Sequence, residues 1–381
     1  LCCRQFVSRW AARLVGAPPA GPRTTSLLAA ALLALAMPCD ALRGANKQTP
    51  AAGDQQADWR QGQRATEAGP FLPERPLDQL WMVSCRCVRT TPASPAANSL
   101  HYWQYVGHGQ WLRSDRERFV SSGSPSLGAC VFVAGYGYDF AETRALGGQV
   151  YRALSSGVAA ERGTRFVIWS WPSDQGDSGI VRDVRATAAR TDGVAWGLAN
   201  WLQETFPGQP VSLIGTSFGA RIVGGALHLL GGGRLGPYGP LQHASTLPPA
   251  QVVFISPAID DDWLLPGHRF DLALSQVKGM LLLNNSADPV MKRYHWLYGR
   301  RSEAEALGHS GLYCRGLGGE TRAKIVQVDA AGVIGVKHGC QPYFQSASLL
   351  ARMRPYVFEF DSPPAPALRG NSLPASFPVA K

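Results

Sequence analysis

The sequence predicts an α/β protein with a mostly parallel central sheet, helices on both faces and an antiparallel edge. Short apolar segments alternate with helix-length segments from about residue 129 to residue 328. The apolar segments carry hydrophobic residues at successive positions, which is typical of strands buried on both faces. A hydrophobic content of 45% suffices for one large core, while 42 glycines and 28 prolines indicate extensive loops.

The expected elements follow one another in a regular order. Two strands, at 80–88 and 100–106, are separated by a turn-rich stretch, which suits an antiparallel edge. Two Gly- or Pro-rich insertions, at 231–249 and 297–319, are expected to leave the sheet on the side of Ser217. The alternating part comprises strand 129–134, helix 140–154, strand 165–169, helix 181–206, strand 210–214, helix 220–230 and strands 251–256, 279–284 and 324–328.

The two ends of the chain differ in composition from the part between them. Residues 1–41 join scattered arginines to a short apolar run, which predicts a signal or targeting segment and export to the periplasm, envelope or medium; a disordered basic leader is the alternative. Residues 42–77 are polar and predict a linker or a disordered stretch. We therefore place the α/β domain at 78–361 and a disordered tail at 362–381.

The chain is basic, with a formal net charge of +10, but its arginines are scattered and form no run. Nucleic-acid-binding proteins concentrate such charge on one stripe, so no nucleic-acid partner is expected. A basic surface is compatible with peripheral association with an anionic membrane or envelope. Outside the leader the cysteines form no CxxC pair, so no metal is expected, and a Cys314–Cys340 disulfide is left open.

The segment Gly215-Thr216-Ser217-Phe218-Gly219 lies between a strand pattern and a helix pattern. In that context G-x-S-x-G is typical of a nucleophile elbow, a sharp turn that lifts a serine above the carboxyl edge of a sheet. The flanking glycines are needed because neighbouring backbone comes too close for a Cβ atom. The following helix points its first N–H groups at the place where an oxyanion would form. Ser217 is therefore the candidate nucleophile.

A serine nucleophile needs a base and a group that orients the base, and α/β-hydrolases carry them in the chain order serine, acid, histidine. Asp288 follows a late strand, and His338 lies in a glycine-containing loop after the closing strand. We therefore predict an α/β-hydrolase fold with the catalytic triad Ser217, Asp288 and His338. The alternatives are that Asp288 only caps a helix, that His338 is a surface histidine, that the acid lies within 260–262, or that His309 is the base.

An oxyanion hole requires two donors, namely the N–H after the nucleophile and one from the loop after an early strand. Phe218 follows the nucleophile directly. Tyr136 lies in Gly135-Tyr136-Gly137, where two glycines allow close approach of its backbone. Read without function, the same residues form a tight turn into a helix, and the two interpretations are compatible.

Taken together, these blocks resemble an α/β-hydrolase-like family of unknown function found mainly in bacteria. The resemblance covers about residues 80–350 and is carried by the Gly135-Tyr136 turn, the block Ser170-Trp171-Pro172-Ser173, the elbow, Ser256-Pro257 before an acid, and Asn285-Ser286-Ala287-Asp288. It implies the same fold and the same triad. The sequence departs from the family pattern at Ala134, where members carry a histidine that braces the oxyanion loop.

Three functions are compatible with these residues. The favoured one is a serine hydrolase that cleaves an acyl ester of a small-molecule or lipid-like substrate through an acyl-enzyme. The others are a catalytically inert binding or envelope-associated protein with the same fold, and an acyltransferase. No cofactor is expected, because no phosphate-binding or dinucleotide-binding glycine loop occurs. Five aromatic residues either line an apolar acyl pocket or belong to the core: Tyr136, Tyr138, Phe140, Trp171 and Phe218.

Overall fold

The computed structural model describes the central part of the chain. The described residues are 75–87, 100–124, 127–158, 163–176, 180–241, 245–295, 305–313 and 316–360. The predicted targeting segment at 1–41, nearly all of the predicted linker, and the predicted tail at 362–381 lie outside them. Cys314, one half of the disulfide left open by the sequence, also lies outside.

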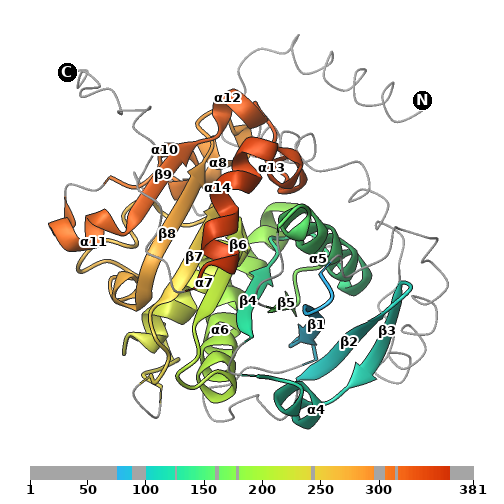
Figure 1. Cartoon of the computed structure of the whole chain (residues 1–381). Coiled ribbons are helices and arrows are strands. Elements are labelled where there is room, and N and C mark those ends of the chain that lie inside the picture. The colour runs from blue at the N-terminus through green and yellow to red at the C-terminus, as the bar shows by residue number, and fades with distance from the viewer. Residues whose placement is uncertain are drawn as a thin grey trace, which may run out of the picture.

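The core of the molecule is one nine-stranded sheet in the order β3-β2-β1-β5-β4-β6-β7-β8-β9 (Figure 1). All pairings from β1 to β9 along this order are parallel, and β2 and β3 form an antiparallel edge. The predicted fold class, an α/β-hydrolase fold with an antiparallel edge, is therefore confirmed. The strands are β1 Gln79–Ser84, β2 His101–Gly107, β3 Gln110–Ser114, β4 Gly128–Val133, β5 Thr164–Ser170, β6 Val211–Thr216, β7 Ala250–Ile255, β8 Val277–Asn284 and β9 Ile325–Asp329.

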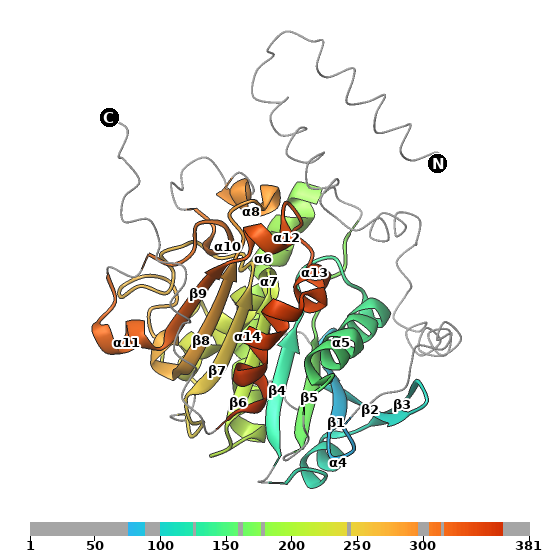
Figure 2. The ribbon, with the colours of Figure 1, turned by 45° about the horizontal axis from the view of Figure 1, so that its top comes forward.

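Helices cover both faces of the sheet, and alternate residues of each strand contact different helices. On β4, Val131 packs in the cluster of α6 and α7, whereas the adjacent Phe132 packs in the cluster of α5 and α14. Figure 2 shows these two pairs of helices on opposite sides of the sheet. The helices are α4 Arg116–Ser121, α5 Phe140–Ser155, α6 Ile180–Thr205, α7 Phe218–Leu230, η3 Ala273–Gln276, α8 Pro289–Lys292, α10 Leu307–Ser310, α11 Gly319–Ala323, α12 Ala331–Ile334, α13 Gln341–Gln345 and α14 Ala347–Phe358.

The antiparallel edge contains elements that the sequence analysis did not predict. A hairpin turns at His108, whose φ is +51°, and brings β3 back along β2. Helix α4 follows and inserts Phe119 into an aromatic cluster, with its ring 4.9 Å from that of Trp81 and 5.8 Å from that of Trp201. This cluster packs the antiparallel edge against helix α6.

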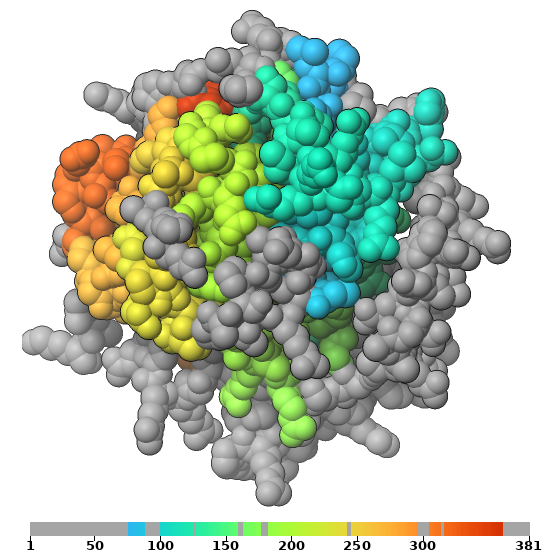
Figure 3. Space-filling model, turned by 90° about the horizontal axis from the view of Figure 1, so that it is seen from below, coloured from blue at the N-terminus to red at the C-terminus, as the bar shows by residue number. Residues whose placement is uncertain are grey.

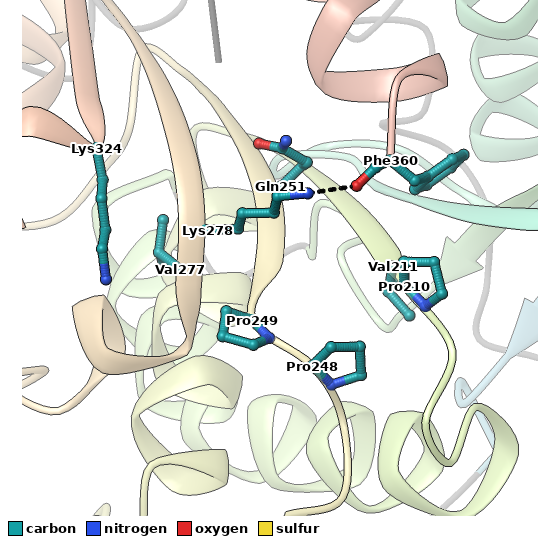
Figure 4. A pocket seen from close by; sticks show the side chains of 9 residues that line it. All are labelled: Pro210, Val211, Pro248, Pro249, Gln251, Val277, Lys278, Lys324 and Phe360. Atoms are coloured by element: carbon teal, nitrogen blue, oxygen red, sulfur yellow. Dashed lines mark hydrogen bonds between the residues drawn. The ribbon is translucent and has the colours of Figure 1, made fainter. Parts of the chain in front are cut away.

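The described part of the insertion at 231–249 lies at the amino edge of the sheet, so its expected position beside Ser217 is wrong. Helix α7 starts at the carboxyl edge and runs back along the sheet, which leaves its last residue at the opposite end. A cavity of about 440 Å³ lies at this amino edge, lined among others by Pro248, Pro249 and Lys324 (Figure 4). Lys278 also lines it and donates a hydrogen bond of 2.6 Å to the carbonyl of Phe360. Figure 3 views the molecule from this edge.

No helix among the described residues is both long enough and apolar enough to cross a lipid bilayer.

Candidate active site

Ser217 lies at the sharp turn between β6 and α7, at the carboxyl edge of the sheet. Its φ of 51° and ψ of −118° are rare for a residue with a side chain, so the turn is strained. Both flanking glycines are required there. A Cβ on Gly215 would lie 2.5 Å from Cα of Ala220, and a Cβ on Gly219 would lie 2.0 Å from the carbonyl oxygen of Val133.

The turn is also fixed by three backbone hydrogen bonds. The N–H of Ser217 donates to the carbonyl of Ile255 at 3.0 Å, which ties the turn to the end of β7. The carbonyl of Ser217 accepts from the N–H groups of Ala220 at 3.1 Å and Ala258 at 3.2 Å. None of these bonds uses the hydroxyl, and the residue as a whole is partly buried.

A chain of hydrogen bonds joins the three residues that the sequence predicted as a triad. Ser217 Oγ lies 3.3 Å from His338 Nε2, and His338 Nδ1 lies 2.7 Å from Asp288 Oδ2. A carboxylate only accepts hydrogen bonds, so Nδ1 carries the proton and Nε2 is left as the acceptor for the serine hydroxyl. This tautomer is the one that a general base needs.

Asp288 is fully buried and serves two groups at once. Its Oδ1 accepts from the backbone N–H groups of Val290 at 2.9 Å and Met291 at 3.2 Å, which caps α8. Its Oδ2 accepts from His338 and from the hydroxyl of Ser256, the latter at 3.0 Å. The helix-capping alternative is thus correct as a description of Oδ1, and it does not compete with the bond to the histidine.

Burial and charge act in opposite directions on this pair. Burial alone would raise the pKa of Asp288, but the nearby His338 and the hydrogen bonds from His338, Met291 and Ser256 outweigh it and lower that pKa. Burial alone would lower the pKa of His338, but the charge and hydrogen bond of Asp288 raise it. Asp288 therefore stays ionised, and a protonated His338 is stabilised.

Two supporting residues were missed by the sequence analysis. Ser256, with φ of 45°, follows β7 and donates to Asp288 from a fully buried position. Asn285 is fully buried and donates from Nδ2 to the carbonyls of Gly335 at 2.8 Å and Lys337 at 3.2 Å. It thereby holds the loop that carries His338. Their signal in the sequence was a small polar residue directly after each of two neighbouring strands.

The rival candidates take part in other contacts. In the acidic group 260–262, Asp262 pairs with His268 at 3.0 Å. Burial, with the charges of nearby acids, raises the pKa of Asp261 to about 6. The backbone carbonyl of His309 accepts a hydrogen bond from a side-chain amide on β8 at 3.2 Å. His338, the predicted base, bonds to Asp288, the predicted acid, so neither rival is needed to complete the chain of hydrogen bonds from Ser217.

The two predicted oxyanion donors come from the elbow itself and from a neighbouring turn. Phe218 is the first residue of α7, so its N–H has no partner within the helix. The other donor, Tyr136, belongs to the turn between β4 and α5, which we call the β4–α5 turn (residues 134–139). A Cβ on Gly135 would lie 3.1 Å from Cβ of Ser217, so this turn runs directly beside the serine.

Two of the five aromatic residues are buried, and the other three are partly buried. Trp171 and Phe218 are buried in the cluster of α6 and α7, with Tyr136 packed against it. Tyr138 and Phe140 pack against the opposite cluster, and Phe140 contacts Trp103 with their rings 4.8 Å apart. The five residues therefore pack on both faces of the sheet.

Within the described residues no group of three His, Cys, Asp or Glu side chains could hold a metal ion. Cys340 is a buried free thiol, and burial raises its pKa to about 12. The thiol therefore stays protonated near neutral pH.

No family model and no curated protein matches the chain. Among solved structures it is similar to esterase B from Lactobacillus rhamnosis inhibited by a tributyrin phosphonate, with 13% identity, a TM-score of 0.35, and coverage of 79% of this chain and 92% of that one. It is also similar to a putative hydrolase from Agrobacterium vitis, with 14% identity, a TM-score of 0.31 and coverage of 69% and 94%. A third is carboxyl esterase 2 from Tuber melanosporum, with 14% identity, a TM-score of 0.30 and coverage of 79% and 96%. Likenesses this distant leave activity and substrate unassigned.

Proposed function

We propose that this protein is a serine hydrolase that cleaves acyl esters through a covalent acyl-enzyme. The observation that carries the proposal is the continuous chain of hydrogen bonds from Ser217 Oγ through His338 to Asp288. A strained elbow supports it independently, because a serine costs stability at that φ and function is the usual reason for such strain.

In the first half of the reaction, Ser217 Oγ attacks the ester carbonyl carbon while His338 Nε2 takes its proton. Asp288 holds the ring in the required tautomer and stabilises the imidazolium that forms. The tetrahedral intermediate then collapses: the carbon–oxygen bond to the alcohol breaks, and His338 returns the proton to the leaving oxygen.

In the second half, water attacks the acyl-enzyme as His338 takes one of its protons. The bond to Ser217 Oγ breaks, the serine recovers its proton, and the carboxylic acid leaves. In both halves the negative oxygen would be held by the N–H groups of Phe218 and Tyr136. Two donors of this kind contribute most when water is excluded from the site.

The first test is labelling of the purified protein with a fluorophosphonate probe, which reacts with activated serines. We expect one label per molecule in the wild type and none in Ser217→Ala. Ser286→Ala is a matched control, since Ser286 also follows a strand at the carboxyl edge but bonds to Asp329. A folded wild type that takes no label would exclude the hydrolase and would favour an inert binding protein.

The second test separates the triad from its rivals by hydrolysis of a short-chain p-nitrophenyl ester. Asp288→Asn and His338→Ala should each lower kcat by roughly 10⁴-fold, as in other triads. Asp260→Asn and His309→Ala should leave kcat within about threefold of the wild type. If Asp260→Asn is the inactive variant, the acid is assigned wrongly.

The substrate class follows as part of the same proposal. A small-molecule or lipid-like acyl group is favoured over a charged one, because the aromatic rings of Tyr136 and Phe218 lie beside the elbow, 6.4 Å apart. A series of p-nitrophenyl esters of increasing acyl length, with and without a competing alcohol acceptor, tests chain-length preference and separates hydrolysis from acyl transfer.

A further inference from the structure

The β4–α5 turn carries a predicted oxyanion donor and begins at Ala134, whose side chain can form no hydrogen bond. Its glycines make it intrinsically flexible, and Gly137 adopts a φ of 94°. An oxyanion donor is effective only when its N–H lies about 2.7–3.1 Å from the developing charge. Something else must therefore hold the turn.

One set of contacts comes from the segment just after β5. Trp171 Nε1 donates to the carbonyl of Ala134 at 2.9 Å. The carbonyl of Ser173 accepts from the N–H of Gly137 at 2.7 Å, and Ser173 Oγ donates to the carbonyl of Tyr138 at 2.8 Å. These bonds fix the turn before and after Tyr136, and Trp171 and Ser173 are both buried.

A second contact comes from far earlier in the chain. Arg86 follows β1, and its side chain is 12% exposed. Its Nη2 donates to the carbonyl of Tyr138 at 2.7 Å and to Thr143 Oγ1 at 3.1 Å, so it binds both the turn and the first residues of α5. Its Nε donates to Ser170 Oγ at 2.7 Å.

The geometry of the Arg86 guanidinium suits this position better than that of a lysine ammonium. The guanidinium is planar and presents its donors in a fixed fork, so one group reaches the β4–α5 turn and the segment after β5 together. Asp174, from that same segment, pairs with Nη1 and balances the charge. A lysine ammonium is a single point and could not bridge these partners at once.

We propose that Arg86 is a positioning residue for the reaction, which holds the β4–α5 turn so that the Tyr136 N–H points at the oxyanion beside Ser217. The inference rests on the proposed hydrolase function and assigns Arg86 no contact with the substrate. Ser173 supports the same turn through its hydroxyl. The turn is thereby held by residues that follow two other strands, β1 and β5.

The test compares Arg86→Ala with Arg354→Ala. Arg354 is a matched control because its guanidinium donates to the carbonyls of Ala153, Leu154 and Ser156 at the other end of the same helix, α5. Steady-state kcat and KM are measured on a p-nitrophenyl ester and expressed per active site, which is counted by fluorophosphonate labelling. Urea denaturation of each variant reports the loss of stability.

We expect Arg86→Ala to lower kcat by about 10- to 100-fold with KM within about twofold, since a misplaced donor weakens binding of the transition state and not of the ester. Arg86→Lys should restore only a small part of the kcat that Arg86→Ala loses. Arg354→Ala should lose comparable stability with kcat unchanged. Should Arg86→Ala fail to fold, Arg86→Lys and Ser173→Ala carry the test, with kcat lowered by about tenfold and about threefold respectively.

The inference is overturned if Arg86→Ala and Arg354→Ala have the same kcat per labelled site, or if Arg86→Ala raises KM alone. A kcat of Arg86→Lys equal to that of the wild type overturns the inference as well. Failure of the proposed function is a distinct result: the wild type itself then shows neither label nor turnover, and the inference falls with it.

Discussion

Replacing Ser217 by glycine should make the protein more stable than replacing it by alanine, although both variants lack the proposed nucleophile. The residue at the elbow has φ of 51° and ψ of −118°, a conformation open to glycine and strained for any residue with a Cβ. Alanine keeps the Cβ and the strain, while glycine removes both. The pair of variants therefore isolates the backbone strain from the loss of the hydroxyl.

The magnitude follows from two opposing contributions. A residue held in such a conformation costs about 1–3 kcal/mol, which Ser217→Gly recovers. Glycine loses more backbone entropy on folding, which costs roughly 0.5–1 kcal/mol relative to alanine. We expect Ser217→Gly to exceed Ser217→Ala by about 1 kcal/mol in free energy of unfolding, or roughly 2–3 °C in Tm.

The assay is urea denaturation followed by tryptophan fluorescence, with thermal unfolding as the second measurement. Equal slopes with urea concentration are required, so that a shift in midpoint reports stability and not a change in the unfolded state. If the glycine variant is equally stable or less stable than the alanine variant, the strain at the elbow does not exceed the entropy cost of glycine, roughly 0.5–1 kcal/mol, and this support for catalysis is lost.

Three further predictions follow from the same geometry. His338 must be neutral to act as a base, and Asp288 raises its pKa, so kcat/KM should increase with pH, with a midpoint above the ordinary histidine value of 6.5. In Asp288→Asn the residual activity should have its midpoint at a lower pH. An unchanged midpoint in that variant would contradict the pairing of Asp288 with His338. Gly219→Ala should destabilise the fold by roughly 3 kcal/mol or more in urea denaturation, since its Cβ meets a backbone carbonyl of β4 at 2.0 Å, whereas Gly318→Ala, with open space around it, should change stability by less than about 0.5 kcal/mol. Asn285→Ala should lower the free energy of unfolding by roughly 2–3 kcal/mol and kcat by about tenfold, because two carbonyls of the loop that carries His338 lose their donor. A normal kcat in a destabilised variant would limit the role of Asn285 to folding.

The parallel part of the sheet was predictable because each of its strands is buried on both faces and is therefore apolar at successive positions. Strand β7, Ala250–Ile255, lies within one residue of its expected bounds at each end. The hairpin partner β3 was not predictable in the same way. It has the sequence Gln-Trp-Leu-Arg-Ser, is mostly exposed, and depends on the turn at His108 and on pairing with β2 for its stability.

The position of the predicted triad residues was accessible to sequence reasoning for a related reason. Parallel strands deliver whatever follows them to the same edge, so Ser217, Asp288 and His338 converge once strand order is known. The contacts that fix them were not accessible. Asn285 acts on a loop 50 residues away, and Arg86 acts on a turn 52 residues away, and neither pairing has a periodic signal.

The double use of Asp288 has a consequence for how the site can be observed. The amide protons of Val290 and Met291 bond to one oxygen of the carboxylate whose other oxygen faces His338. Any change of charge at the imidazole redistributes electron density across that carboxylate and alters both bonds. In an isotope-labelled sample, the chemical shifts of these two amides therefore form an internal titration signal. They report ionisation of the imidazole without substrate, without turnover and without a modified residue.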